Sequence, residues 1–338
     1  MAKRLKLAII GDPHLAAPQG SDDALLDIDG GMKLHRQSVL LLTAAINAVN
    51  AEPDLDALLL LGDMTRDSEL FNHEAAADLL SALRVPLYIL AGNHDFQRVR
   101  RAGSGYDNAV RLDRAEFTQF WHGRGLPEQS TRYKAELPGG VDLIALDTNL
   151  TGAELAEREI DLKLQDHGFV EAEQLQWLDA QLAGTRAAGR LPLVAAHHSV
   201  MDQSPAEGQQ HPLVSIFGFW QVRESAALRS VLQRYDVPLV LSGHLHIQSV
   251  NQQDRITNLV CAALVSYPHT WGVLTVDAGA MHYESRGLEQ HLPRGFIEES
   301  RVATNIGIGN LIAHELRTHP LLGTQARGIA QMVMASDW

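Results

Sequence analysis

Residues 5–14 read LKLAIIGDPH, a short apolar run that stops abruptly at Gly11 and Asp12. A run of this kind is typical of a buried β-strand whose carboxyl end emerges into polar surroundings. Five more runs stop in the same way, and they cover residues 57–61, 86–91, 141–146, 191–196 and 238–241. We therefore predict six buried strands whose carboxyl ends carry polar residues.

Segments with helical spacing lie between the predicted strands. Apolar residues recur at i, i+3, i+4 and i+7 in residues 42–49 and again in residues 228–235. Alternating strands and helices predict βαβ units, with sheets that are at least partly parallel and helices that cover their faces. Two further apolar runs, residues 258–265 and 271–277, predict a hairpin-like antiparallel portion. Ligands of such architectures bind beyond the carboxyl ends of the strands.

The composition is that of a folded globular chain. At about 150 residues per domain, the 338 residues correspond to roughly two domains, or to one large α/β unit with an appendage. Hydrophobic residues make up 45% of the chain and charged residues 20%, which excludes collagen-like and intrinsically disordered classes. The single cysteine, Cys261, excludes an internal disulfide and a cysteine-based zinc finger.

Charge and hydropathy bear on partners and location. The formal net charge of -13 is opposite in sign to that of a general binder of the nucleic-acid backbone. The first apolar run meets Gly11 and Asp12 too soon for a signal peptide, and no stretch approaches the roughly 18 apolar residues of a membrane helix. We expect a soluble cytoplasmic protein that binds neither a nucleic-acid polymer nor a membrane.

Five polar motifs follow the predicted strands. Each has a structural explanation when taken alone, because a histidine near a strand end is more often a packed side chain and a Gly-Asp pair is more often a turn. All five occur in one chain, however, and the strand ends of packed sheets converge on one edge. Carboxylate, amide and imidazole groups that meet there suit a divalent ion such as Mn, Fe, Zn or Co. The motifs are Asp12-Pro13-His14, Gly62-Asp63, Gly92-Asn93-His94-Asp95, His197-His198 and Gly243-His244-Leu245-His246.

As an ordered set, these motifs resemble those of the calcineurin-like metallophosphoesterases, over about residues 5–283. The resemblance implies a four-layer αββα sandwich, in which two mixed β-sheets are flanked by helices and two divalent metal ions lie at one end. It also implies the ligands of the ions, which are Asp12, His14, Asp63 and His246 for the first and Asp63, Asn93, His197 and His244 for the second.

Residues beside these ligands are candidates for other roles. In the family pattern His94 faces the substrate phosphate and assists the leaving oxygen, and Asp95 orients His94. His198 is either a wall of the substrate pocket or a residue behind the ligands. Arg98 could bind a second phosphate or a charged leaving group, although a solvated basic stretch explains it as well.

The resemblance implies a phosphohydrolase in which a hydroxide bridging the two ions attacks phosphorus. Residues 12–94 are most similar to the branch that cleaves cyclic nucleotides and glycerophosphodiesters, which favours a small phosphodiester as substrate. That branch usually has Pro-Pro after the paired histidines, whereas Ser199 and Val200 stand here, so a phosphomonoester of a small metabolite stays open. A DNA exonuclease is disfavoured by the net charge, and a non-catalytic scaffold by the complete set of motif residues.

The chain divides at residue 283 in this interpretation. We expect a catalytic domain over residues 1–283 and an extension over residues 284–338, which is a lid over the site, an arm of a homodimer or a neutral tail. Three long loops, residues 15–32, 97–112 and 201–220, are candidates for lids or binding loops.

Overall fold

The structure, a computed structural model, describes residues 4–18, 33–98, 108–201 and 221–305. Much of the three predicted long loops, and residues 306–338 of the predicted extension, therefore lie outside the described residues. No helix within the described ranges is both long and apolar enough to span a membrane.

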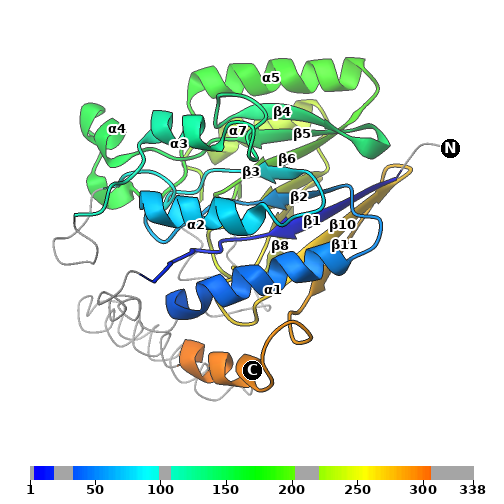
Figure 1. Ribbon diagram of the computed structural model, residues 1–338. Coiled ribbons are helices and arrows are strands. Elements are labelled where there is room, and N and C mark those ends of the chain that lie inside the picture. The colour runs from blue at the N-terminus through cyan, green and yellow to red at the C-terminus, as the bar shows by residue number, and fades with distance from the viewer. Residues whose placement is uncertain (1–3, 19–32, 99–107, 202–220, 306–338) are drawn as a thin grey trace, which may run out of the picture.

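Strands and helices alternate along most of the chain (Figure 1). The strands are β1 (Leu5–Ile10), β2 (Ala57–Leu60), β3 (Leu87–Ile89), β4 (Tyr133–Leu137), β5 (Val141–Leu146), β6 (Leu191–Ala196), β7 (Leu239–Ser242), β8 (Ser249–Gln253), β9 (Ile256–Val260), β10 (Trp271–Asp277) and β11 (Ala280–Arg286). The α-helices are α1 (Ser38–Ala51), α2 (Leu70–Leu80), α3 (Arg114–Trp121), α4 (Gly152–Glu157), α5 (Ala172–Ala187) and α7 (Ser225–Arg234). Short 3-10 turns are η2 (His35–Gln37), η3 (Pro138–Gly140) and η4 (Leu162–Leu164), and a further helix covers residues 296–305.

Two mixed β-sheets form the centre of the molecule. One has five strands in the order β11-β10-β1-β2-β3, and the other has six in the order β4-β5-β6-β7-β9-β8. Pairing is parallel from β1 through β2 to β3, and from β5 through β6 and β7 to β9. All six strands predicted from the sequence belong to these parallel portions, which confirms them.

Side chains that alternate along the central strands build two cores. On β5, Leu143 belongs to the larger core, which also contains residues of the five-stranded sheet and of α1 and α2, whereas Ile144 belongs to a second core with α5 and α7. Because successive side chains of a strand point to opposite faces of the sheet, one face of the six-stranded sheet packs on the other sheet and the opposite face packs on helices. A helix layer accordingly lies outside each sheet (Figure 1). The predicted sandwich of two mixed sheets flanked by helices is therefore confirmed.

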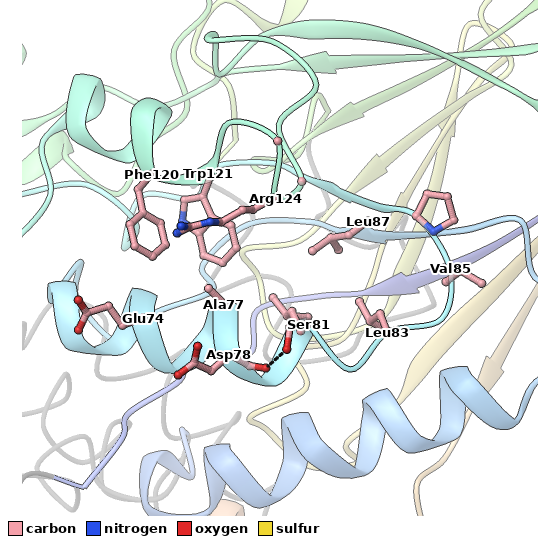
Figure 2. A pocket seen from close by; sticks show the side chains of 14 residues that line it. Glu74, Ala77, Asp78, Ser81, Leu83, Val85, Leu87, Phe120, Trp121 and Arg124 are labelled. Atoms are coloured by element: carbon pink, nitrogen blue, oxygen red, sulfur yellow. Dashed lines mark hydrogen bonds between the residues drawn. The ribbon is translucent and has the colours of Figure 1, made fainter.

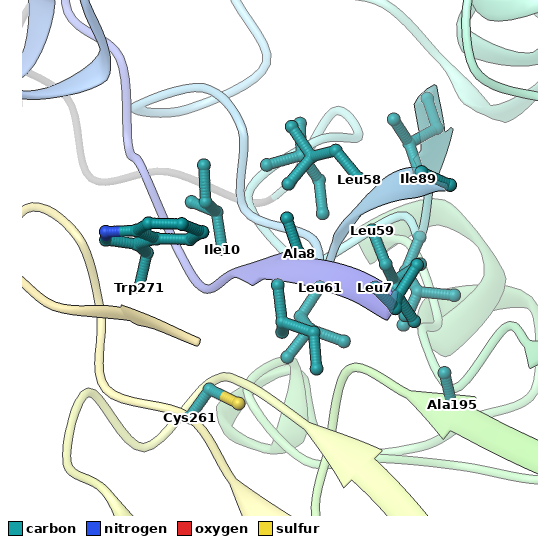
Figure 3. Close-up of a cluster of buried hydrophobic side chains, with 14 of the residues drawn as sticks. Leu7, Ala8, Ile10, Leu58, Leu59, Leu61, Ile89, Ala195, Cys261 and Trp271 are labelled. Atoms are coloured by element: carbon teal, nitrogen blue, oxygen red, sulfur yellow. The ribbon is translucent and has the colours of Figure 1, made fainter. Parts of the chain in front are cut away.

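The larger core joins the two sheets. Figure 3 shows Leu7 and Leu59 of the five-stranded sheet in one cluster with Ala195 of the six-stranded sheet, and all three are fully buried. Complete burial of a leucine side chain contributes about 1.5–3 kcal/mol. Packing of this kind fixes the relative position of the strand ends, where the motif residues lie.

The predicted hairpin between residues 258–265 and 271–277 is wrong. β9 pairs with β7 and β8 in the six-stranded sheet, whereas β10 pairs with β1 and β11 in the other sheet. Each run instead forms a hairpin with a more polar strand, β8 or β11, whose side chains are largely exposed or half-buried. Strands with so little buried surface give a weak hydrophobic signal, which explains why the sequence pattern misses them.

The predicted domain boundary at residue 283 falls inside β11, which continues to Arg286. Beyond it, Leu288 and Leu292 are buried in the larger core, and Phe296 and Ile297 of the last helix pack against that core. Residues 284–305 therefore complete the same folded unit.

One buried amide links β9 to the end of β6, where two motif histidines lie. Oδ1 of Asn258 accepts hydrogen bonds from Ser199 Oγ at 2.7 Å and from Val200 N at 2.9 Å. Its Nδ2 donates to Val240 O at 3.2 Å and to Ser242 Oγ at 3.1 Å. The Asn258 side chain is fully buried, so removing it leaves polar groups that water cannot reach.

We predict that Asn258→Ala lowers the free energy of unfolding by about 2–4 kcal/mol, because several buried partners lose their hydrogen bonds together. Urea denaturation followed by circular dichroism measures this change. The exposed Gln252→Ala on β8 is the control and should change the free energy by less than about 0.5 kcal/mol. Equal losses in the two variants would contradict this account of the Asn258 contacts.

Candidate metal centre

The structure brings the motif residues together at the carboxyl ends of parallel strands from both sheets. Most of them are buried, whereas His94 and His246 are half-buried. In chain order they are Asp12 and His14 after β1, Asp63 after β2, Asn93 and His94 after β3, His197 after β6, and His244 and His246 after β7.

A first group of possible ligands consists of Asp12, His14, Asp63 and His246. One nitrogen or oxygen atom from each lies within 4.8 Å of the others. Nε2 of His14 is 3.0 Å from Nε2 of His246 and 3.3 Å from Oδ2 of Asp63. Two imidazole nitrogens at this separation need a shared proton or a shared cation. Oδ2 of Asp12 is buried and has no hydrogen-bond partner among the described residues.

A second group surrounds Asn93. Its Oδ1 is 3.0 Å from Nε2 of His197 and 3.1 Å from Nδ1 of His244. Nε2 of His197 is also 3.5 Å from Oδ1 of Asp63. Asp63 therefore faces the first group with one carboxylate oxygen and the second group with the other.

Five of these residues have an uncommon backbone conformation. The φ angles of Asp12, His14, Asp63, His244 and His246 are 43°, 41°, 49°, 69° and 60°. The left-handed region costs an L-residue roughly 1–2 kcal/mol, and it persists only where the surrounding structure imposes it. All five residues lie in the turns that follow β1, β2 and β7. The sequence motifs alone give no sign of this conformation.

Backbone groups hold both carboxylates in place. His94 N donates to Oδ1 of Asp63 at 2.8 Å, and His244 N donates to Oδ1 of Asp12 at 2.8 Å. The glycine before Asn93 allows this close approach, because a Cβ atom at Gly92 would lie 2.1 Å from Oδ1 of Asp63.

The charges of the site favour a cation. Burial raises the pKa of Asp12 to about 7, and the nearby Asp63 carboxylate adds to this rise. Burial also acts to raise the pKa of Asp63, but the surrounding imidazoles, His197 foremost, hold it well below its usual range. Burial acts to lower the pKa of His197, but the Asp63 carboxylate overrides it and raises the pKa to about 9. The space beside Asp63 therefore stabilises positive charge.

The remaining imidazoles of the two groups are suited to coordinate a metal. Burial keeps the pKa values of His14, His244 and His246 well below 6.5, so these rings are neutral at neutral pH. A neutral imidazole has one nitrogen lone pair available for a metal ion. Together with carboxylate and amide oxygens, this donor set fits divalent ions of the Mn, Fe, Zn and Co type.

The carboxylate of Asp95 contacts backbone groups around the turn after β3. Its Oδ2 accepts from Gly92 N at 2.9 Å and its Oδ1 from Thr65 N at 3.1 Å, so this buried carboxylate holds the turn after β3. The His94 ring is instead oriented by Nδ1, which lies 2.8 Å from the carbonyl oxygen of Arg66. Asp95 is next to His94 in sequence, but the turn directs its side chain toward the backbone.

Two cationic side chains lie at the other nitrogen of the His94 ring. Nη1 of Arg98 is 2.7 Å and Nζ of Lys33 is 3.4 Å from Nε2 of His94. Since Nδ1 donates to a carbonyl oxygen, Nε2 is the acceptor of this ring. Arg98 and Lys33 therefore both lie at the acceptor side of the His94 ring. Lys33 precedes the first helical segment and belongs to none of the five motifs, so no local sequence pattern marks it as a site residue.

His198 lies behind the possible ligands. Its ring is fully buried, its centroid is 4.3 Å from that of His244, and its Nδ1 is 2.8 Å from Thr148 Oγ1. Gly168 packs against it so closely that a Cβ there would lie 2.6 Å from the Cβ of His198. This burial and these contacts favour the second alternative for His198, a residue behind the ligands. One of its ring nitrogens also lies within 4.8 Å of nitrogens of His197 and His244.

A groove of about 940 Å³ opens elsewhere, beside α2 (Figure 2). Leu83 and Leu87 line it together with Glu74 and Arg124, and the Arg124 guanidinium lies 4.7 Å from the centre of the Phe120 ring. None of the motif residues lines this groove, so it is separate from the metal centre.

Comparison with known proteins supports the resemblance drawn from the motifs. A family model described as calcineurin-like phosphoesterase matches residues 5–248. A 3′,5′-cyclic-nucleotide phosphodiesterase of Nostoc sp. is 25% identical over 209 residues, which are 60% of this chain and 60% of that protein. The 3′,5′-cyclic adenosine monophosphate phosphodiesterase CpdA of Escherichia coli K12 is 24% identical over 245 residues, covering 72% of this chain and 70% of that protein. The match thus spans less than two thirds of the Nostoc protein.

A solved structure shares the fold. The crystal structure of a dimetal phosphatase from Danio rerio has a TM-score of 0.60 and 18% sequence identity, and the match covers 84% of this chain and 96% of that one. At this identity the likeness concerns the architecture of the two sheets and their helices.

We predict that Gly92→Ala weakens metal binding by about tenfold or more, since the new Cβ displaces Asp63 and perturbs the surroundings of both ligand groups. Metal content after gel filtration, measured by mass spectrometry, tests this. The control is Gly184→Ala in α5, where a Cβ meets no atom within 4 Å and should stabilise the helix by roughly 0.5–1 kcal/mol. Unchanged metal content in Gly92→Ala would show that Asp63 does not bind the metal.

Proposed function

Because the chain belongs to the calcineurin-like phosphoesterase family, whose members are metal-dependent hydrolases, we propose that it cleaves a small phosphodiester of the cyclic-nucleotide type. The observation that carries the proposal is the position of Asp63 between two groups of possible ligands, with His94 and Arg98 beside them. The named activities of the Nostoc and Escherichia coli relatives support the choice of a cyclic phosphodiester.

In this proposal the two ligand groups hold two divalent cations. Bound there, such ions supply Lewis-acid charge to the phosphoryl oxygens and activate water as the nucleophile. The chain's own contribution is to fix the ligands with buried backbone hydrogen bonds. The ligands are Asp12, His14, Asp63 and His246 for one ion and Asp63, Asn93, His197 and His244 for the other.

His94 and Arg98 act on the substrate side. The carbonyl oxygen of Arg66 fixes the proton of His94 on Nδ1, so Nε2 is the ring atom on the substrate side, and it gives a proton to the departing oxygen only after it has taken one up from solvent. Burial, together with Lys33 and Arg98, lowers the pKa of His94, so its ring is neutral at neutral pH. Arg98 and Lys33 carry the hydrogen-bond donors for a phosphate oxygen.

We assign the non-phosphate part of the substrate to a pocket beside Arg98, although none of the motif residues lines that pocket. Arg98 lines this pocket of about 430 Å³ together with Gln97, the start of α3 and the start of α4. A small alcohol or nucleoside fits such a volume.

A phosphomonoester is the second candidate substrate. Two cationic side chains, Arg98 and Lys33, converge on Nε2 of His94. A phosphomonoester carries more negative charge than a diester at neutral pH, so this pair of cations suits it. Direct comparison of the two substrate classes decides between them.

We predict that the Mn²⁺-loaded protein hydrolyses 3′,5′-cyclic AMP and bis-p-nitrophenyl phosphate, with a higher kcat/KM for these diesters than for p-nitrophenyl phosphate. His94→Asn should lower kcat by about 10²–10⁴-fold while leaving the bound metal unchanged. Steady-state kinetics and metal analysis of the same samples give both quantities.

The exposed His122→Asn, at the end of α3, is the matched control and should retain the parent activity. A higher kcat/KM for the monoester would favour the second candidate. Absence of turnover of all three compounds in protein that retains its metal would contradict the proposed function.

A further inference from the structure

We propose that Asp166, which lies outside all five motifs, is a positioning residue that ties the metal ligand Asn93 to the substrate-side Arg98. Asp166 follows the 3-10 turn η4, and neither its position in sequence nor its neighbours mark it as a site residue. The inference rests on the proposed function, because it assigns Asn93 to a cation and Arg98 to the substrate.

A single oxygen of Asp166 contacts both residues. Nδ2 of Asn93 donates to Oδ1 of Asp166 at 3.0 Å. Nη2 of Arg98 donates to the same Oδ1, while Nη1 of Arg98 lies 2.7 Å from Nε2 of His94. A continuous chain of polar contacts therefore runs from the second ligand group to the substrate-facing histidine.

Asp166 determines which end of the Asn93 amide faces the ligands. A carboxylate accepts hydrogen bonds only, so it must be met by the NH₂ end of the amide. The oxygen end is then directed at His197 and His244, where it lies 3.0 and 3.1 Å from their ring nitrogens. Without this acceptor the amide is free to reverse, which would present NH₂ groups to a cation. Partners of this kind raise metal affinity by fixing the orientation of a ligand.

The same carboxylate fixes Arg98. A guanidinium is a planar fork, so anchoring one arm defines where the other arm points. With Nη2 on Asp166, the Nη1 arm is held at Nε2 of His94. The Arg98 side chain is only 11% exposed, which limits its alternatives further.

Backbone contacts hold the segment that carries Asp166 against the site. Phe169 N donates to Thr148 O at 2.9 Å, and Arg223 N donates to Gly168 O at 2.9 Å. Gly168 also packs directly on His198, as described above. The Asp166 side chain is itself 39% exposed, so a substitution there removes contacts of the site without opening the core.

The competing explanation is an ordinary surface ion pair, which contributes little at most such positions. The two explanations differ in the effect expected on metal affinity, since a surface ion pair between Asp166 and Arg98 would not influence the ligand Asn93. Three variants and one control separate them.

Asp166→Ala removes the acceptor for both partners. We expect it to weaken retention of the second Mn²⁺ ion by about tenfold and to lower kcat/KM for bis-p-nitrophenyl phosphate. Asp166→Asn keeps an oxygen acceptor for Asn93, and we expect it to restore Mn²⁺ retention to within about threefold of the parent. Arg98→Gln leaves the contact between Asp166 and Asn93 intact, and we expect it to lower kcat/KM with Mn²⁺ retention unchanged.

Mn²⁺ retention is measured by dialysing the loaded full-length protein against graded chelator and counting ions per chain.

Asp179→Asn is the matched control, because it removes a comparable ion pair, with Arg234, on the outer helices α5 and α7. The proposal is overturned if Asp166→Ala retains both Mn²⁺ ions and has the same kcat/KM for bis-p-nitrophenyl phosphate as Asp179→Asn. It is also overturned if Asp166→Asn loses as much Mn²⁺ as Asp166→Ala. The retention measurement needs no turnover, so failure of the proposed function, seen as an inactive parent, is distinguished from failure of this inference.

Discussion

The carboxylate of Asp63 is the group on which the site depends, because its two oxygens face two different sets of ligands. A buried carboxylate is costly unless positive charge or hydrogen bonds compensate it. Here His94 N donates to it, and the imidazoles around it hold its pKa low. The proposed pair of cations would offset the rest of the cost of burying the Asp63 carboxylate. Such a pair can bind only where ligands from both sheets come together.

The fold provides that meeting place at some cost in backbone energy. Packing of the two sheets through residues such as Leu59 and Ala195 sets the distance between their strand ends. Five of the seven proposed ligands have the left-handed backbone conformation, which is uncommon for residues other than glycine. Two carboxylates outside the set of ligands also hold the site in place. Asp166 accepts a hydrogen bond from the side chain of Asn93, and Asp95 accepts one from the backbone of Gly92.

Much of this arrangement could be predicted from the sequence, because apolar runs that stop at polar residues locate both the parallel strands and the chemistry at their ends. The limits of such prediction have physical causes. β8 and β11 bury little surface, so periodicity does not reveal them. Lys33 and Asp166 come close to His94 and Asn93 only through folding, and no local pattern records that proximity. Asp95 shows the converse, since adjacency in sequence to His94 does not bring their side chains together.

The central claim is that two cations lie on either side of Asp63. Anomalous diffraction from crystals of the Mn²⁺-loaded protein tests it most directly. The account predicts two anomalous peaks per chain, one among Asp12, His14 and His246 and the other among Asn93, His197 and His244, with Asp63 between them. A single peak, or peaks held by other side chains, would contradict it.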